Sequence, residues 1–216
     1  MISVKLHLAV MDDGFETNTY IVTDEATGET LVVDPSLPEE ALAQKLEGKN
    51  VKYILITHGH YDHIGGLNFV KEKTGAKVVV HKEEIEMLLD GNKNEYHSKY
   101  TSPMPPMSID ILVEDGTELM LGNSKIKVLH TPGHTKGGVC YIFEDDRVMI
   151  SGDTLFRLTA GRTDLYGGDA RTELMSLAKI GELDGDYQVY PGHDRATTLD
   201  FERQYNRYMR TRFRRK

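Results

Sequence analysis

The order of apolar and polar residues along the chain predicts a β-rich protein with interspersed helices. Alternating or short continuous apolar runs predict strands at 1–10, 18–24, 29–34, 51–57, 76–81, 117–121, 125–130, 139–143, 147–153 and 187–192. Helical spacing of apolar residues predicts helices at 65–75, 82–91 and 170–181, one that follows the capping-box pair Ser36 and Glu39 and ends at Gly48, and one from about residue 197.

The same order of predicted elements occurs twice along the chain. Residues 20–60 contain a hairpin that ends at Asp34, then a helix, then a strand that ends in Gly-His. Residues 141–193 repeat this order, with Asp153 at the end of the hairpin. We therefore expect two similar β-rich halves packed sheet against sheet, with helices outside and both Gly-His sites at one edge.

Residues 91–110 form the longest irregular stretch and are interrupted by prolines. Long loops in compact proteins often carry function, so two interpretations stay open. The loop either only covers the core or forms a lid over a substrate mouth lined by Tyr96, His97, Tyr100, Met104 and Met107.

Length and composition favour a globular protein over membrane-spanning or exported classes. The 216 residues suit one domain, 1–216, and no apolar run approaches the roughly 20 residues that cross a bilayer. The N-terminal residues lack the apolar core of a secretion signal, and the single cysteine, Cys140, provides no disulfide framework. We therefore expect a cytoplasmic protein with no membrane partner and leave its oligomeric state open.

The formal net charge of -8 argues against nucleic acid as a partner, because nucleic acids bind basic surfaces. The C-terminal segment is an exception and carries Arg203, Arg207, Arg210, Arg212, Arg214, Arg215 and Lys216. These cations could bind an acidic partner or RNA. We favour a solvated helix end whose cations interact with the helix dipole.

A cluster of histidine and aspartate residues suggests a metal centre. It comprises residues that directly follow predicted strands, namely His58, His60, Asp62, His63, His134, Asp153 and His193. Imidazole and carboxylate ligands suit zinc, iron or manganese, and the set is too large for one ion that must also hold water. We expect two divalent ions, with zinc favoured and Asp153 able to bridge. Scattered polar loop residues would explain single positions but not the joint pattern with neighbouring glycines.

These motifs resemble the metallo-β-lactamase fold superfamily, whose His-x-His-x-Asp-His signature stands here at residues 58–63. The resemblance continues through TPGHTKGG, SGDTLF and YPGHDRATTLDFE, and the segments GDTLF, GRTD and GGD look like those of short glyoxalase II-like hydrolases. It implies an αββα sandwich of two mixed sheets with helices outside. It also implies one ion held by His58, His60 and His134, a second held by Asp62, His63 and His193, and Asp153 between them.

The resemblance further implies hydrolysis of a small acyl-thioester, such as a hydroxyacylglutathione, by a hydroxide held between the ions. Asp62 and Asp153 would orient the bridging water or accept its protons, and Asp34 of VVDPS would orient the metal loop. Glyoxalase II enzymes carry a further C-terminal helical domain that supplies much of their glutathione site. This chain ends 23 residues after His193, so the thiol carrier stays open.

Residues outside the ligand set carry weaker expectations. Arg162 and Asp164 of the GRTD segment are expected to pair and brace their loop, with substrate contact by Arg162 as the alternative. Tyr166, Tyr96 and Tyr100 are further candidate substrate contacts.

A persulfide dioxygenase is the main alternative, because such enzymes also resemble this sequence and share its Gly-Arg-Thr-Asp segment. They use one iron held by two histidines and an aspartate, which here would be His58, His134 and Asp153. We favour the hydrolase on the GDTLF and GGD segments. A ribonuclease, a secreted β-lactamase and a non-catalytic binding module fit less well, given the acidic balance, the lack of an export signal and the full ligand set.

Overall fold

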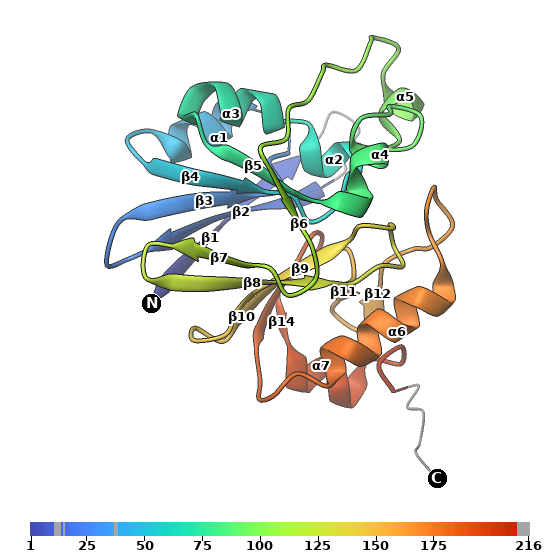
Figure 1. Ribbon diagram of the computed structural model, residues 1–216. Coiled ribbons are helices and arrows are strands. Elements are labelled where there is room, and N and C mark those ends of the chain that lie inside the picture. Colours follow the sequence, from blue (N-terminus) through green and yellow to red (C-terminus); the bar gives the residue numbers. More distant parts are fainter. Residues whose placement is uncertain (11–13, 15, 37–38, 211–216) are drawn as a thin grey trace.

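The computed structural model describes residues 1–10, 14, 16–36 and 39–210. Two six-stranded sheets pack face to face, and helices cover the outer face of each sheet (Figure 1). This αββα arrangement confirms the predicted fold class. Within the described ranges, no helix is both long and apolar enough to cross a bilayer.

The first sheet is built from the N-terminal half of the chain. Its strands, in spatial order, are β1 (Ile2–Val10), β2 (Glu16–Asp24), β3 (Glu29–Val33), β4 (Asn50–Leu55), β5 (Lys77–His81) and β6 (Ile111–Val113). Strands β1 to β3 are antiparallel, whereas β3 to β6 run parallel. The carboxyl ends of the parallel strands therefore lie along one edge of the sheet.

The second sheet is built from the C-terminal half. Its strands, in spatial order, are β14 (Thr197–Thr198), β13 (Gln188–Pro191), β10 (Val148–Gly152), β9 (Val139–Phe143), β8 (Ser124–His130) and β7 (Glu118–Leu121). Strands β10 and β13 are parallel and the other neighbours are antiparallel. A separate small hairpin comprises β11 (Leu155–Phe156) and β12 (Thr159–Ala160).

The helices are short and cover the sheets from outside. They are α1 (Glu39–Leu46), α2 (Tyr61–Ile64), α3 (Leu67–Thr74), α4 (Ile85–Leu88), α5 (Tyr96–Lys99), α6 (Ala170–Gly181) and α7 (Leu199–Tyr205), with the 3-10 turn η1 (Lys82–Glu84). Helices α1 and α3 lie over the first sheet, and α6 and α7 lie over the second (Figure 1). The predicted repeat is confirmed, because β2–β3–α1–β4 and β9–β10–α6–β13 share one order and one pairing pattern.

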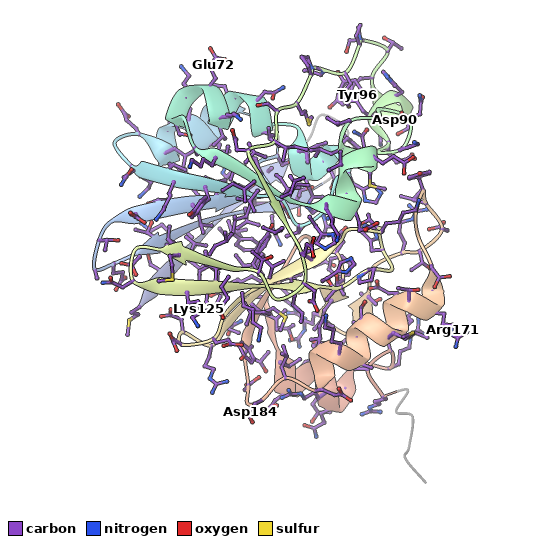
Figure 2. The ribbon with its side chains drawn as sticks, viewed as in Figure 1. Glu72, Asp90, Tyr96, Lys125, Arg171 and Asp184 are labelled. Atoms are coloured by element: carbon purple, nitrogen blue, oxygen red, sulfur yellow. The ribbon has the colours of Figure 1, made fainter. Side chains whose placement is uncertain are left out.

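Three apolar layers hold the sandwich together. The inner layer lies between the sheets and includes Leu55, Val79 and Tyr141, all fully buried. One outer layer packs the first sheet against α1 and α3, and the other packs the second sheet against α6 and α7. Figure 2 shows side chains filling these layers, whereas the labelled Glu72 and Asp184 point outward.

Several elements differ in extent from the predictions. The helix expected at 65–75 is preceded by α2, so Asp62 and His63 lie on a helical turn rather than in a loop. The helix expected at 82–91 is only η1 followed by the single turn of α4. Helix α7 begins at Leu199, because the preceding residues pair with β13 as strand β14. Apolar spacing identifies the buried side of such segments, but tertiary hydrogen bonds decide where each turn starts and stops.

The ends of two other predicted helices need comment. Helix α1 begins at Glu39, and residues 37–38, which would join it to the predicted cap at Ser36, lie outside the described residues. The basic segment was predicted as the end of the last helix, but α7 stops at Tyr205, and residues 211–216 lie outside the described residues. Arg203 instead donates to the carbonyl of Gly181 at the end of α6 at 3.1 Å, which satisfies an unpaired carbonyl of that helix.

Candidate metal centre

Both sheets place polar loops at the same end of the sandwich. The segment 58–63 follows β4 in the first sheet, while Asp153 and His193 follow the parallel neighbours β10 and β13 in the second. The N–H of Val139 donates to the carbonyl of Thr57 at 3.0 Å and so links the first loop to the second sheet. Sheet packing therefore brings segments that are far apart in sequence to one site.

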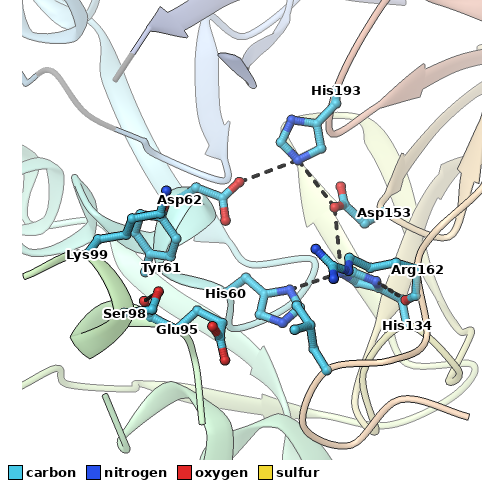
Figure 3. A pocket seen from close by; sticks show the side chains of 11 residues that line it. His60, Tyr61, Asp62, Glu95, Ser98, Lys99, His134, Asp153, Arg162 and His193 are labelled. Atoms are coloured by element: carbon cyan, nitrogen blue, oxygen red, sulfur yellow. Dashed lines mark hydrogen bonds and ion pairs between the residues drawn. The ribbon is translucent and has the colours of Figure 1, made fainter. Parts of the chain in front are cut away.

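The predicted ligand residues all meet at this site. Figure 3 shows His60, Asp62, His134, Asp153 and His193 pointing into one space. His60 Nδ1 lies 2.9 Å from His134 Nε2, and His193 Nε2 lies 3.4 Å from the nearer carboxylate oxygen of Asp62. The remaining two predicted ligands, His58 and His63, are buried behind them.

Three clusters of possible ligand atoms occur among the described residues, each with its atoms within 4.8 Å of one another, and one of them, Asp34 with His58 and His63, overlaps the other two. The other two are the predicted groups, His58 with His60 and His134, and Asp62 with His63 and His193. Asp153 lies between them, with Oδ2 at 3.6 Å from His134 Nε2 and 3.3 Å from His193 Nε2. This carboxylate is therefore placed to contact an ion in either group.

Buried atoms without partners test whether these residues fit metal ions. His58 Nε2, His60 Nε2 and Asp153 Oδ1 are buried and make no hydrogen bond to any described residue. Leaving such atoms unsatisfied is costly, and native proteins rarely do so without an ion, a water or a functional reason. All three atoms belong to imidazole or carboxylate side chains of the ligand cluster, so the residues present fit a cation.

Hydrogen bonds fix the orientation of several imidazole rings. The Nδ1 atoms of three rings contact oxygen acceptors, His63 with Asp34 at 2.9 Å, His134 with the carbonyl of Arg162 at 2.7 Å and His193 with the carbonyl of Glu16 at 2.5 Å. An oxygen acceptor places the ring proton on Nδ1. The lone pair is then on Nε2, which is the arrangement that a metal-binding histidine needs.

Asp34 joins the metal loop to the first sheet. Its carboxylate accepts from the N–H of Thr57 at 2.7 Å, from the Thr57 hydroxyl at 2.5 Å and from His63 Nδ1. Asp34 has a positive φ of 49°, a conformation that is uncommon outside glycine. The structure thus places Asp34 beside the ligands, with its oxygen atoms already engaged, as expected for a residue that orients the loop.

Burial and neighbouring charges control protonation in the cluster. Burial lowers the pKa of His60 to about 3 and keeps the pKa of His58 well below its usual value, so both rings are neutral and able to ligate. Burial also opposes a charge on His63, but the carboxylates of Asp62 and Asp153 raise its pKa well above the usual value. The carboxylates therefore demand positive charge that a divalent ion can supply in place of a proton.

A cleft crosses the ligand cluster and has two lobes. One lobe, of about 210 Å³, lies beside α5 and is lined outside the ligand set by Tyr61, Glu95, Ser98, Lys99, Arg162 and Leu165. The other, of about 560 Å³, lies beside the β11–β12 hairpin and includes Phe156, Thr159 and Ala160. Both lobes share His134, Asp153, Arg162 and His193, so a substrate could extend to either side of the ligands.

The predicted substrate contacts have mixed outcomes. Arg162 lines both lobes and also pairs with Asp164 through two hydrogen bonds of 2.7 and 2.8 Å, the bracing predicted from GRTD. The three tyrosines predicted as substrate contacts, Tyr96, Tyr100 and Tyr166, line neither lobe. Tyr166 instead contacts the ammonium groups of Lys93 and Lys136, each 5.1 Å from its ring centre.

The long loop does reach the cleft, but through other residues than those predicted. The rings of Tyr96 and Tyr100 pack against each other with centres 4.9 Å apart, and Glu95, Ser98 and Lys99 form the wall instead. Met107, also predicted at the mouth, packs against the outer core of the first sheet. The sequence shows no periodicity in this loop, so side-chain directions could not be predicted from it.

Glu84 is a buried residue near the ligands that the sequence analysis missed. It lies behind the ligand loops, in the turn η1, and its side chain is buried. A signal was available, because Glu84, Met87 and Leu88 share one face at helical spacing and the other two are apolar and buried. An acid within an apolar stripe indicates a specific buried partner.

Comparisons with known proteins agree with this geometry. A family model described as the metallo-β-lactamase superfamily matches residues 12–193. A hydroxyacylglutathione hydrolase of Pelagibacter ubique is 36% identical over 178 residues, which cover 82% of this chain and 66% of that protein.

Solved structures show the same fold. BLEG-1, described as a B3 metallo-β-lactamase, is 32% identical with a TM-score of 0.87, and the match covers 96% of this chain and 100% of that one. TTHA1623 in a di-iron-bound form is 28% identical with a TM-score of 0.81, covering 94% and 99%. ETHE1 from Myxococcus xanthus is 28% identical with a TM-score of 0.71, covering 94% and 83%.

Proposed function

The chain belongs to the metallo-β-lactamase superfamily, and we propose that it is a glyoxalase II-like hydrolase of small acyl-thioesters that uses two divalent metal ions. The position of Asp153 carries this proposal, because it lies between two complete three-residue ligand groups on the floor of a two-lobed cleft. The similarity to a hydroxyacylglutathione hydrolase supports the substrate class.

The bound ions would supply an activated water at neutral pH and a Lewis acid for the substrate carbonyl. The residues of the chain orient these groups. Asp62 accepts a hydrogen bond from the Thr17 hydroxyl at 3.0 Å through Oδ2, which fixes its carboxylate, and Asp153 Oδ1 lies 3.4 Å from His63 Nε2, which orients the second carboxylate. The thiol that corresponds to a thiolate leaving group has a pKa of about 8.5, so the thiolate can leave without a dedicated proton donor.

We propose zinc as the resident metal, with iron or manganese as alternatives. The six side chains of the two three-residue groups are all imidazoles or carboxylates, and such donors bind all three metals. The related structure of TTHA1623 was solved in a di-iron-bound form, which supports iron as an alternative metal. We also propose a cytoplasmic location, because the buried free thiol of Cys140 suits a reducing compartment.

A mononuclear iron dioxygenase acting on persulfides is the alternative. His58 Nε2 and His134 Nε2 lie 3.9 and 3.6 Å from Asp153 Oδ2, which groups the two histidines and one carboxylate that such an iron site uses. Such dioxygenases keep the other motif residues too, so the GDTLF and GGD segments, rather than the ligand set, favour the two-ion hydrolase.

Metal analysis combined with a substrate panel tests the proposal. Protein purified without added metal or chelator is expected to contain close to two ions per chain and to hydrolyse lactoylglutathione. One iron per chain, with oxygen consumption on glutathione persulfide and no thioester cleavage, would overturn it. A chromogenic β-lactam belongs in the panel because of the likeness to BLEG-1.

The variant Asp153→Ala is expected to lose both the paired ions and turnover, because Asp153 Oδ2 lies 3.6 Å from His134 Nε2 of one group and 3.3 Å from His193 Nε2 of the other. Asp145→Ala is the matched control, because it makes the same chemical change at an exposed position outside the cleft. Full activity with two ions bound to Asp153→Ala would contradict the bridging role.

A further inference from the structure

Glu84 is a carboxylate enclosed in the protein behind the ligand loops. Its side chain is 1% exposed, whereas the neighbouring Lys82 and Glu83 in the same turn are exposed. Buried carboxylates are rare unless they are paired or hydrogen-bonded, so the position of Glu84 requires specific partners.

Those partners come from two separate loops. Oε1 accepts from the N–H of Gly59 at 2.8 Å, and Oε2 accepts from the N–H of Gly137 at 2.7 Å and from the Thr135 hydroxyl at 3.0 Å. Gly59 lies between His58 and His60. Thr135 follows His134 directly. The side chain therefore joins the two loops that supply the His58, His60 and His134 group.

The backbone around Glu84 is shaped for this contact. A Cβ atom at Gly137 would lie 2.4 Å from the backbone nitrogen of Glu84, which no other residue could accommodate without a shift. A Cβ atom at Gly59 would lie 3.2 Å from the backbone nitrogen of Leu88, tighter than ordinary contact. These two glycines let both loops approach the same carboxylate closely.

We propose that Glu84 is a positioning residue that sets the spacing of the His58, His60 and His134 group and leaves the other group largely unaffected. Among the described residues, its hydrogen bonds reach Gly59, Thr135 and Gly137 and no member of the Asp62, His63 and His193 group. Asp34 has the corresponding place beside His63. This inference rests on the metal centre proposed above and is independent of the substrate.

An acceptor at both oxygens is essential to this role. A glutamine keeps the size of Glu84 but turns one acceptor into an NH2 group, which would face the N–H of Gly59 or of Gly137. One loop would then lose its bond to the other. Burial raises the pKa of Glu84 to about 7, against the effect of the hydrogen bonds from Gly59, Thr135 and Gly137, so measurements at pH 8.5 keep the carboxylate ionised.

Cobalt titration of Glu84→Gln tests the proposal without relying on turnover. The two ions are distinguished by their visible spectra, with His60→Ala and His193→Ala as references that each remove a ligand from one group. We expect Glu84→Gln to lose 10- to 100-fold in affinity for the ion whose spectrum His60→Ala removes, as is usual when a partner of a metal ligand is lost. Affinity for the other ion should change by less than about threefold, which is well below the 10- to 100-fold loss expected for the first ion.

Two further variants guard against a general loss of structure. Glu83→Gln makes the same chemical change one residue away at an exposed position and should bind both ions like the parent protein. Thr135→Val removes one of the three donors to Glu84 while keeping the side-chain shape, and should weaken the same ion less than Glu84→Gln does.

Equal weakening of both ions, together with a lower melting temperature of the metal-free protein, would overturn the proposal in favour of a purely structural role. Unchanged affinity for both ions in Glu84→Gln would also overturn it. Failure of the hydrolase proposal would look different. It would appear as absent thioester turnover in the parent protein, while the cobalt comparison of Glu84→Gln with its controls would still stand.

Discussion

Asp34 holds His63 in the tautomer that a metal needs, so Asp34→Asn perturbs the metal centre without removing a ligand. The carboxylate faces His63 Nδ1 at 2.9 Å, which places the proton there and leaves a lone pair on Nε2. If an amide NH2 faced Nδ1 instead, that nitrogen would become the acceptor and Nε2 would carry the proton. His63 could then no longer bind an ion through Nε2.

The hydrogen bonds of Asp34 decide which way the new amide lies. Oδ1 accepts from the N–H of Thr57 at 2.7 Å, and a backbone N–H requires an oxygen at that position. The NH2 group must then take the place of Oδ2, opposite His63, where the Thr57 hydroxyl can rotate to accept from it. Loss of such a partner typically lowers metal affinity 10- to 100-fold, about 1.4 to 2.7 kcal/mol.

Competition with a chromophoric chelator measures this loss directly. Asp34→Asn is expected to weaken the ion that His63 binds, and the metal-free variant should still give a cooperative unfolding transition. The exposed Asp145→Asn makes the same chemical change in a hairpin and serves as the control. A folded Asp34→Asn protein with parental affinity for both ions would refute the tautomer argument.

Two stability predictions concern contacts between the sheets. Tyr141→Phe removes a buried hydroxyl that donates to the carbonyl of Ile56 at 2.8 Å, so urea unfolding of the metal-free protein should show a loss of about 1–3 kcal/mol with an unchanged m-value. Asp24 accepts from the Ser124 hydroxyl at 2.8 Å and from Thr27, which lowers the pKa of Asp24 to about 2. The stabilising effect of Asp24 should be present above about pH 4 and be lost as the pH falls towards 2. Thermal melts of Asp24→Asn should lack this acid-dependent loss of stability. Equal pH profiles for the variant and the parent protein would contradict the prediction.

The sequence predicts that these histidines and aspartates lie together, because the signal is local. His58, His60 and Asp62 lie in one short segment after a buried strand, and such segments meet at one edge of the sandwich whatever their exact boundaries. Register and turn ends are less predictable. Strand β6 has three residues, too few for alternation to show, and α2 depends on its contact with the rest of the chain, where the N–H of Tyr61 donates to the carbonyl of Asn94.

Side chains on loops lie beyond what the sequence can predict. Tyr96 and Tyr166 were reasonable candidates by residue type, yet their directions depend on partners from other segments, such as Lys93 and Lys136 around Tyr166. The same holds for Arg203, whose contact with the end of α6 requires the two C-terminal helices to be packed first. Residue type indicates what a side chain can do, whereas tertiary packing decides what it touches.

Neither ligand group belongs to a single sheet, and this has a kinetic consequence. The segment 58–63 extends from the first sheet, while His134 and His193 extend from the second, and each group combines both sources. Neither of these two groups is complete until the sheets have docked, which joins contacts far apart in sequence and is therefore a slow step. During refolding with cobalt present, the growth of the metal absorption would time this docking and distinguish it from the earlier formation of the separate sheets.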